Sequence, residues 1–124
     1  MSDEKAESLA NLLQKAGFKR IIAKTLAYMI YNPKTTSKKI EHAMLLRQPE
    51  VCLALQTLEK MNWVKVSERD AGGQGRPSNI YTLAKPAGEI LDEIIKKLDE
   101  NIKHYKDLAN RLKSFKKIGG EKKI

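Results

Sequence analysis

The feature that most constrains the fold is a pair of strand-like segments separated by a turn rich in glycine and proline. Residues 64–69 alternate between apolar and polar side chains, as a half-buried strand does, and residues 80–83 form the return strand. Residues 70–78 between them hold three glycines and one proline, which is the composition of a loop. The sequence therefore predicts a two-stranded hairpin whose tip carries the cationic side chain of Arg76.

A short helix is predicted immediately before this hairpin. Pro49 suits the first turn of a helix, because the N–H that proline lacks has no helical partner there. Apolar residues at helical spacing predict a buried stripe that comprises Val51, Ala54, Leu55 and Leu58. The exposed positions at the start of this helix are predicted to be Arg47, Gln48, Pro49, Glu50 and Leu53.

Three helices are predicted upstream of this one. The first covers residues 4–16, where leucines recur at helical spacing, and the second runs from Phe18 until Pro33 ends it. The third is short and ends around Leu45–Leu46. Residues 35–37 offer hydroxyl groups that can cap its first turn.

The longest predicted element is a helix over residues 86–117. Four of its apolar residues lie seven apart, at 91, 98, 105 and 112, which is the spacing of a helix that pairs with another helix. A small domain cannot cover an apolar stripe of about seven turns, so we expect a second copy of the chain to cover it. Residues 118–124 are expected to form a flexible basic tail. The predicted dimer contacts are Leu91, Ile94, Ile95, Leu98, Ile102, Tyr105, Leu108 and Leu112.

The net charge of +9 is concentrated in the middle of the chain. Residues 19–86 hold 12 basic and 5 acidic side chains, a net charge of +7, whereas residues 1–18 have −1 and residues 87–124 have +3. A localised positive field attracts nucleic acid and supplies affinity that does not depend on base sequence. The charged segment is also the one that contains the short helix and the hairpin.

Composition and motifs exclude several other classes of function. No apolar run approaches the roughly 18 residues of a membrane helix, and residues 1–5 are too polar for a signal peptide, so a cytoplasmic protein is expected. Cys52 is the only cysteine, and His42 and His104 lie far apart, so no disulfide, metal site or cofactor is expected. Residues 72–75 lack the helix and lysine that would follow in a phosphate-binding loop. An enzyme is therefore not expected.

The segment from Arg47 to Val64 resembles the recognition segment of TrmB-like and MarR-like winged-helix regulators. Asn62 replaces the usual glycine of the pattern and also tolerates a left-handed helix end. Residues 75–83 resemble the wing pattern G-R-P-x-x-x-Y-x-L. The positions that match V-x-x-x-L-x-x-L-E-K-x-G-[LW]-[VI] are Val51, Leu55, Leu58, Glu59, Lys60, Trp63 and Val64.

This resemblance covers residues 18–98 and implies a winged helix-turn-helix fold, mainly α with a small β-hairpin wing. Residues 1–85 would form the DNA-binding domain, and residues 86–117 the dimerisation helix. The implied function is that of a homodimeric transcription regulator, a repressor, on double-stranded DNA. No effector ligand is implied, because the sugar-binding domain of larger TrmB proteins would not fit in this length.

In such a protein the recognition helix lies in the major groove, and the wing arginine lies at the minor groove or the phosphate backbone. The alternative is a winged-helix module that has lost base readout and joins protein assemblies through its long helix. The predicted DNA contacts are Ser37, Lys38, Lys39, Arg47, Gln48, Pro49, Glu50, Leu53, Arg69, Arg76 and Ser78.

Several side chains have a second interpretation. Ser37 can cap its helix instead of binding phosphate, and Glu50 can orient a neighbouring basic side chain instead of contacting cytosine. Cys52 lies on the recognition helix but lacks cationic neighbours in the sequence, so an inert, partly buried thiol is expected rather than a redox switch. Trp63 is expected in the core rather than as a platform for base stacking.

Overall fold

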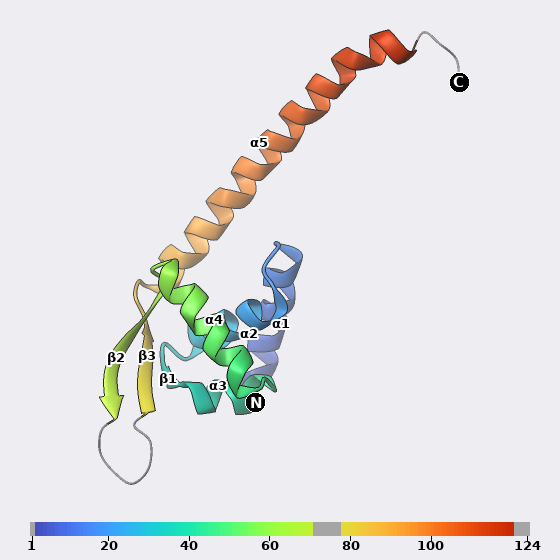
Figure 1. The fold of residues 1–124 in the computed structure, drawn as a ribbon. Coiled ribbons are helices and arrows are strands. Elements are labelled where there is room, and N and C mark those ends of the chain that lie inside the picture. Colours follow the sequence, from blue (N-terminus) through green and yellow to red (C-terminus); the bar gives the residue numbers. More distant parts are fainter. Residues whose placement is uncertain (1, 71–77, 121–124) are drawn as a thin grey trace. The chain divides into compact units, whose positions relative to one another are not determined.

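A computed structural model describes residues 2–70 and 78–120, with side chains for residues 4–67 and 79–116. It confirms the predicted fold class, which is mainly α with a small antiparallel sheet and a long C-terminal helix (Figure 1). The elements in chain order are α1 (Ser2–Lys15), α2 (Arg20–Tyr31), β1 (Lys34–Thr36), α3 (Ser37–Met44), α4 (Gln48–Lys60), β2 (Val64–Asp70), β3 (Ser78–Leu83) and α5 (Ala87–Gly120).

The chain divides into two compact units, residues 1–90 and 91–124. The division lies one helical turn after the predicted boundary at residue 85, because the first turn of α5 belongs to the first unit. Ile90, at the end of that turn, is fully buried. The first unit therefore includes all the other helices and strands together with the start of α5.

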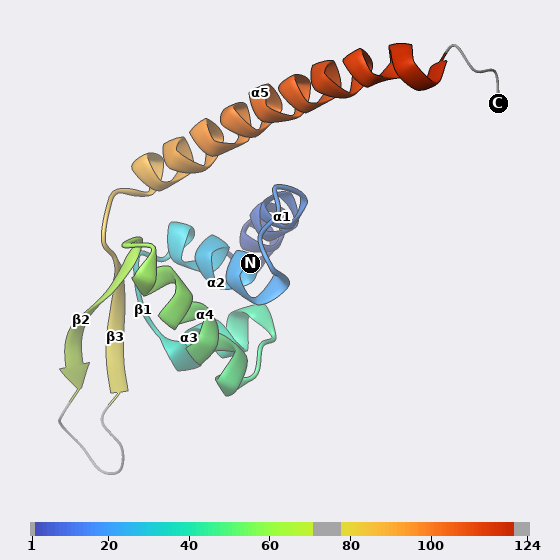
Figure 2. The ribbon, with the colours of Figure 1, turned by 45° about the horizontal axis from the view of Figure 1, so that its top comes forward.

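The core of the first unit forms where α1, α3 and α4 pack around α2 (Figure 2). Four apolar residues of α2 are completely buried because its apolar side chains recur on more than one side: Ala23, Leu26, Ala27 and Met29. Trp63 is also buried, as predicted, and its ring centroid lies 6.0 Å from that of Phe18. This packing fixes the positions of α3 and α4, which carry most of the predicted DNA contacts.

The sheet contains a third strand that the sequence analysis missed. β1 pairs with β3 in antiparallel register, with Lys34 opposite Thr82 and Thr36 opposite Ile80, so the strand order is β1-β3-β2. Three residues are too few to show the alternation that identifies a strand. The capping prediction for the same segment is confirmed, because the Thr36 hydroxyl accepts a hydrogen bond of 3.3 Å from the backbone N–H of Lys39.

The predicted hairpin is confirmed as β2 and β3. Its register shifts between Val66 and Glu68, and the Ser67 hydroxyl beside this shift donates a 3.2 Å hydrogen bond to the carbonyl of Ile80. β3 begins two residues earlier than predicted, at Ser78. The predicted tip, including Arg76, lies outside the described residues.

Left-handed backbone conformations mark two turns of the first unit. Asn62 follows α4 with a φ of 63°, which confirms that asparagine takes the position that glycine usually occupies. Leu45 follows α3 with a φ of 55°, so this helix ends one residue before the predicted Leu45–Leu46 terminus. A leucine in this conformation is strained, and it allows a sharp turn into α4.

α5 contains 34 residues, which corresponds to a length of about 51 Å. It extends through Gly120 and so includes the first three residues of the predicted flexible tail; residues 121–124 lie outside the described part. From Ile95 onward, its predicted dimer contacts are 36–70% exposed in the single chain. None of the helices, over the residues described, has the length and apolar character needed to cross a bilayer.

Candidate nucleic-acid interface

α4 has a buried side and an exposed side. The predicted buried stripe is confirmed, because Val51, Ala54, Leu55 and Leu58 are at most 2% exposed. The sequence places these residues three or four apart, so they lie on one side of the helix and pack into the first unit. The opposite side is exposed and comprises Gln48, Pro49, Cys52, Leu53, Gln56, Glu59 and Lys60.

The exposed side of α4 is uncharged over its first two and a half turns. Pro49, Leu53 and Gln56 are four and three residues apart, so their side chains form one row along the helix. Gln48 and Cys52 form a second row beside the first. The two rows meet at Gln56, which lies four residues after Cys52. We call the surface formed by Gln48, Pro49, Cys52, Leu53 and Gln56 the outer face of α4.

Glu50 lies at the start of α4, and its carboxylate contacts two basic residues. One oxygen accepts a 2.9 Å hydrogen bond from the backbone N–H of Arg47, while the other lies 3.5 Å from Nη2 of Arg20 on α2. These contacts satisfy an N–H at the helix start and tie α4 to α2. They correspond to the alternative interpretation of Glu50, in which it orients its neighbours.

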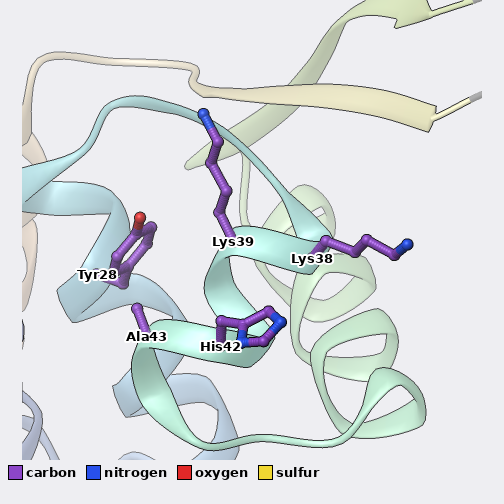
Figure 3. A pocket seen from close by; sticks show the side chains of 5 residues that line it. All are labelled: Tyr28, Lys38, Lys39, His42 and Ala43. Atoms are coloured by element: carbon purple, nitrogen blue, oxygen red, sulfur yellow. The ribbon is translucent and has the colours of Figure 1, made fainter.

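The start of α3 carries two exposed lysines, Lys38 and Lys39, next to the half-buried Ser37. Both lysines help to line an open pocket of about 420 Å³, together with Tyr28, His42 and Ala43 (Figure 3). Their side chains extend in different directions from the helix (Figure 3). The two ammonium groups therefore do not converge on a single point in the pocket.

The predicted contacts of the hairpin are only partly described. Arg69 lies in β2 opposite Asn79, and Ser78 lies in β3 opposite Asp70, but the side chains of Arg69 and Ser78 are outside the described set. Lys65 in β2 is exposed. In both ribbon views α3, the N-terminal end of α4 and the far ends of β2 and β3 lie along the same lower edge (Figures 1 and 2).

Sequence analysis missed two residues of the outer face. Cys52 was expected to be partly buried, but it is exposed, and that prediction is wrong. Gln56 is exposed on the same side of the helix and is not among the predicted DNA contacts. The signal for both is helical spacing from Gln48, since Cys52 and Gln56 follow it at intervals of four. Among the described residues, no group of three or more His, Cys, Asp or Glu side chains could hold a metal ion.

No family model and no curated protein matches the sequence, whereas solved structures do match the fold. A crystal structure of a transcriptional regulator has a TM-score of 0.54 at 14% identity, over 88% of this chain and 73% of that one. NMB1585, a MarR family regulator from Neisseria meningitidis, has a TM-score of 0.53 at 16% identity, over 94% and 89%. The structure of disulfide-formed AbfR has a TM-score of 0.52 at 18% identity, over 94% and 88%.

These likenesses extend over most of both chains, at 88–94% of this chain and 73–89% of the others. At identities of 14–18% they establish the fold and leave the individual site residues as predictions. The MarR-like part of the predicted resemblance is confirmed, and the TrmB-like part stays a prediction. The chain has the winged-helix fold of the MarR-family transcription regulators.

Proposed function

We propose that this chain is a cytoplasmic transcription regulator, a repressor, that binds double-stranded DNA sequence-specifically as a homodimer. In this proposal α4 lies in the major groove, α3 binds the phosphate backbone, and the β2–β3 wing lies beside the helix over the backbone or the minor groove. The paired α5 helices join the two DNA-binding units of the dimer. The observation that carries the proposal is the exposed, uncharged outer face of α4, next to the exposed lysines of α3.

The outer face has the size and chemistry that base readout requires. The major groove of B-DNA, about 12 Å wide, admits an α-helix with its side chains. Gln48 at the first turn offers an amide that can donate to and accept from a base edge. Glu50 supports this arrangement from the side, because its contacts with Arg47 and Arg20 hold the first turn of α4 in place.

Phosphate contacts come from cations around this face. Lys38, Lys39 and Arg47 are exposed on α3 and at the start of α4, and Lys65 is exposed on the wing. The different directions of Lys38 and Lys39 suit contacts with separate phosphates along a backbone (Figure 3). Arg76, predicted from the sequence to reach the minor groove or backbone, would add a contact from the wing tip.

The exposed seam of α5 supports the homodimer. Apolar side chains every seven residues, of which Tyr105 and Leu112 are 67% and 70% exposed, suit pairing with a second helix. A twofold dimer presents two α4 helices, so we expect a palindromic operator. Its half-sites would lie about 34–36 Å apart, one turn of the duplex, or a multiple of that distance.

The test of this function is selection of bound duplexes from a random pool, followed by a salt titration on the selected sequence. Six to ten neutralised phosphates would lower affinity by about 10³ to 10⁵ between 50 and 200 mM salt. Recovery of a palindrome is expected. A chain that selects no duplex at low salt would instead be the protein-assembly module, for which the exposed α5 seam is the supporting observation.

Two sets of variants separate backbone contacts from base contacts. Replacing Lys38 and Lys39 by alanine removes four lysines from a homodimer, so it is expected to weaken binding to all duplexes alike and to reduce the salt slope by about four. Gln48→Ala is expected to alter the preference among sequences. Lys113→Ala is the matched control, since it removes an exposed lysine from α5. If the α3 variants bind as the control does, the proposed interface is wrong.

A further inference from the structure

The outer face of α4 places an exposed apolar side chain between amide groups. Leu53 is 56% exposed and lies in one row with Pro49 and Gln56. Single exposed leucines are ordinary on protein surfaces and need no explanation of their own. Leu53 differs because it belongs to the surface proposed to enter the major groove, where it lies between Gln48 and Gln56 along the helix axis and about 140° around the helix from Gln48.

The chemistry of this surface favours some bases over others. Guanine is usually recognised by arginine or lysine, and cytosine by a carboxylate. The outer face contains neither. Arg47, exposed just before α4, is assigned to the phosphate backbone above, and Glu50 is bonded to the Arg47 N–H and lies beside the Arg20 guanidinium. Its polar members are Gln48 and Gln56, and a glutamine amide pairs in a bidentate manner with N6 and N7 of adenine.

We propose that α4 recognises A·T base pairs, and that Leu53 is a specificity-determining residue that contacts the 5-methyl group of thymine. Gln48 and Gln56 bind adenines on either side of this contact. The proposal rests on the DNA-binding function proposed above and specifies which bases the helix recognises. Thymine is the only standard base that presents a methyl group in the major groove, so an exposed leucine discriminates it from cytosine.

The spacing of the three side chains agrees with stacked base pairs. Along an α-helix, Leu53 lies about 4.5 Å from Gln56 and about 7.5 Å from Gln48, at 1.5 Å per residue. Successive base pairs rise by about 3.4 Å. The three side chains span about 12 Å along the helix axis, or about 3.5 base-pair steps, so we expect an A·T-rich core of four to five base pairs in each half-site.

The test uses deoxyuridine, which pairs as thymine does but lacks the methyl group. Each thymine of the duplex selected from the random pool is replaced in turn, and the dissociation constant is measured for the wild-type chain and for Leu53→Ala. For the wild type, one replacement in each half-site core is expected to weaken binding by about fourfold, the value of one buried methyl-sized group. For Leu53→Ala the same replacement is expected to have no effect, because the alanine side chain has three fewer carbon atoms and does not reach the methyl group.

Leu12→Ala is the matched control. Leu12 is an exposed leucine on α1, 62% exposed, so the variant loses the same atoms at a different surface. It is expected to keep the fourfold ratio between thymine and deoxyuridine duplexes. Leu53→Ala should fold, since the side chain is mostly exposed and alanine favours helices. Circular dichroism on all three proteins checks this point.

The outcomes separate this inference from the proposed function. If no duplex is selected, the DNA-binding function fails, and the inference fails with it. If duplexes are selected but their half-site core is G·C-rich, the function stands and A·T recognition is wrong. If Leu53→Ala retains the fourfold deoxyuridine penalty, or the wild type shows none, the thymine contact is wrong although DNA binding remains.

Discussion

α4 and α5 are both amphipathic helices, yet their apolar residues have different surroundings. In α4 the stripe of Val51, Leu55 and Leu58 is at most 2% exposed, because other elements of the first unit cover it. In α5 the seam from Ile95 onward remains 36–70% exposed in the single chain. Helical periodicity therefore predicts which face of a helix will be covered, but it does not say whether the same chain or another one covers it.

This difference has a thermodynamic consequence that distinguishes the two helices. Burial within one chain stabilises the folded monomer, so its loss appears at any protein concentration. Burial between two chains stabilises the dimer, so its loss depends on concentration by mass action. Substitutions of leucine on the two helices should therefore give different signatures.

The largest effect is expected for Leu108→Glu on the α5 seam. Each leucine buried between paired helices contributes about 2 kcal/mol, and a homodimer loses two of them. The dimer should weaken by about 4 kcal/mol, roughly a thousandfold in its dissociation constant. Sedimentation at several concentrations measures this change, and affinity for a palindromic duplex should fall with it.

Asn110→Glu provides the control for this substitution. It adds the same charge two residues further along α5, about 200° around the helix from Leu108, at an exposed position away from the seam. Its dimer constant should stay close to that of the wild type. Equal weakening by both variants would mean that added charge, and not loss of the seam, separates the chains.

Local patterns explain why most of the first unit could be predicted. The spacing of Val51, Leu55 and Leu58 and the proline at position 49 are enough to define α4, and Thr36 caps α3 as expected. β1 could not be predicted in this way. Its three residues form a strand only because β3, more than forty residues later, offers N–H and C=O groups in register with Lys34 and Thr36.

The candidate site also contains features that depend on residues distant in the sequence. Two interpretations of Glu50 were possible from the sequence, and the contact that distinguishes them comes from Arg20, thirty residues earlier. Only the packing of α2 against α4 brings these two side chains together. Cys52 was predicted to be partly buried from its lack of cationic neighbours, although its position four residues after Gln48 placed it on the exposed side. Contacts between side chains that are far apart in the sequence cannot be predicted from local patterns.

An intermediate effect is expected for Leu58→Ala on the buried side of α4. Leu58 is completely buried, so the substitution removes apolar contacts and leaves a cavity. The free energy of unfolding should fall by about 2–5 kcal/mol. Urea unfolding at two protein concentrations measures it, and the loss should be the same at both.

Leu108→Ala is the matched substitution on α5 for this experiment. It removes the same atoms from the exposed seam. Its destabilisation should therefore be smaller at the lower protein concentration, where fewer chains are dimeric. A concentration-independent loss for Leu108→Ala would show that the seam packs within its own chain. That result would remove the difference between the two helices.

The smallest effect is expected for Thr25→Val, which tests whether the core of the first unit excludes water. Thr25 lies in α2 and is completely buried, and its hydroxyl has no hydrogen-bond partner among the described residues. A buried hydroxyl without a partner opposes folding, so valine should raise the free energy of unfolding by about 1 kcal/mol. Urea unfolding with an unchanged m-value would show this as a higher midpoint.

Thr57→Val is the control, because the Thr57 hydroxyl donates a 3.1 Å hydrogen bond to the carbonyl of Leu53, and its removal should give no gain in the free energy of unfolding. A loss of stability in Thr25→Val would mean that this hydroxyl has a partner, such as a buried water, and that the core around α2 is less dry than the apolar packing implies.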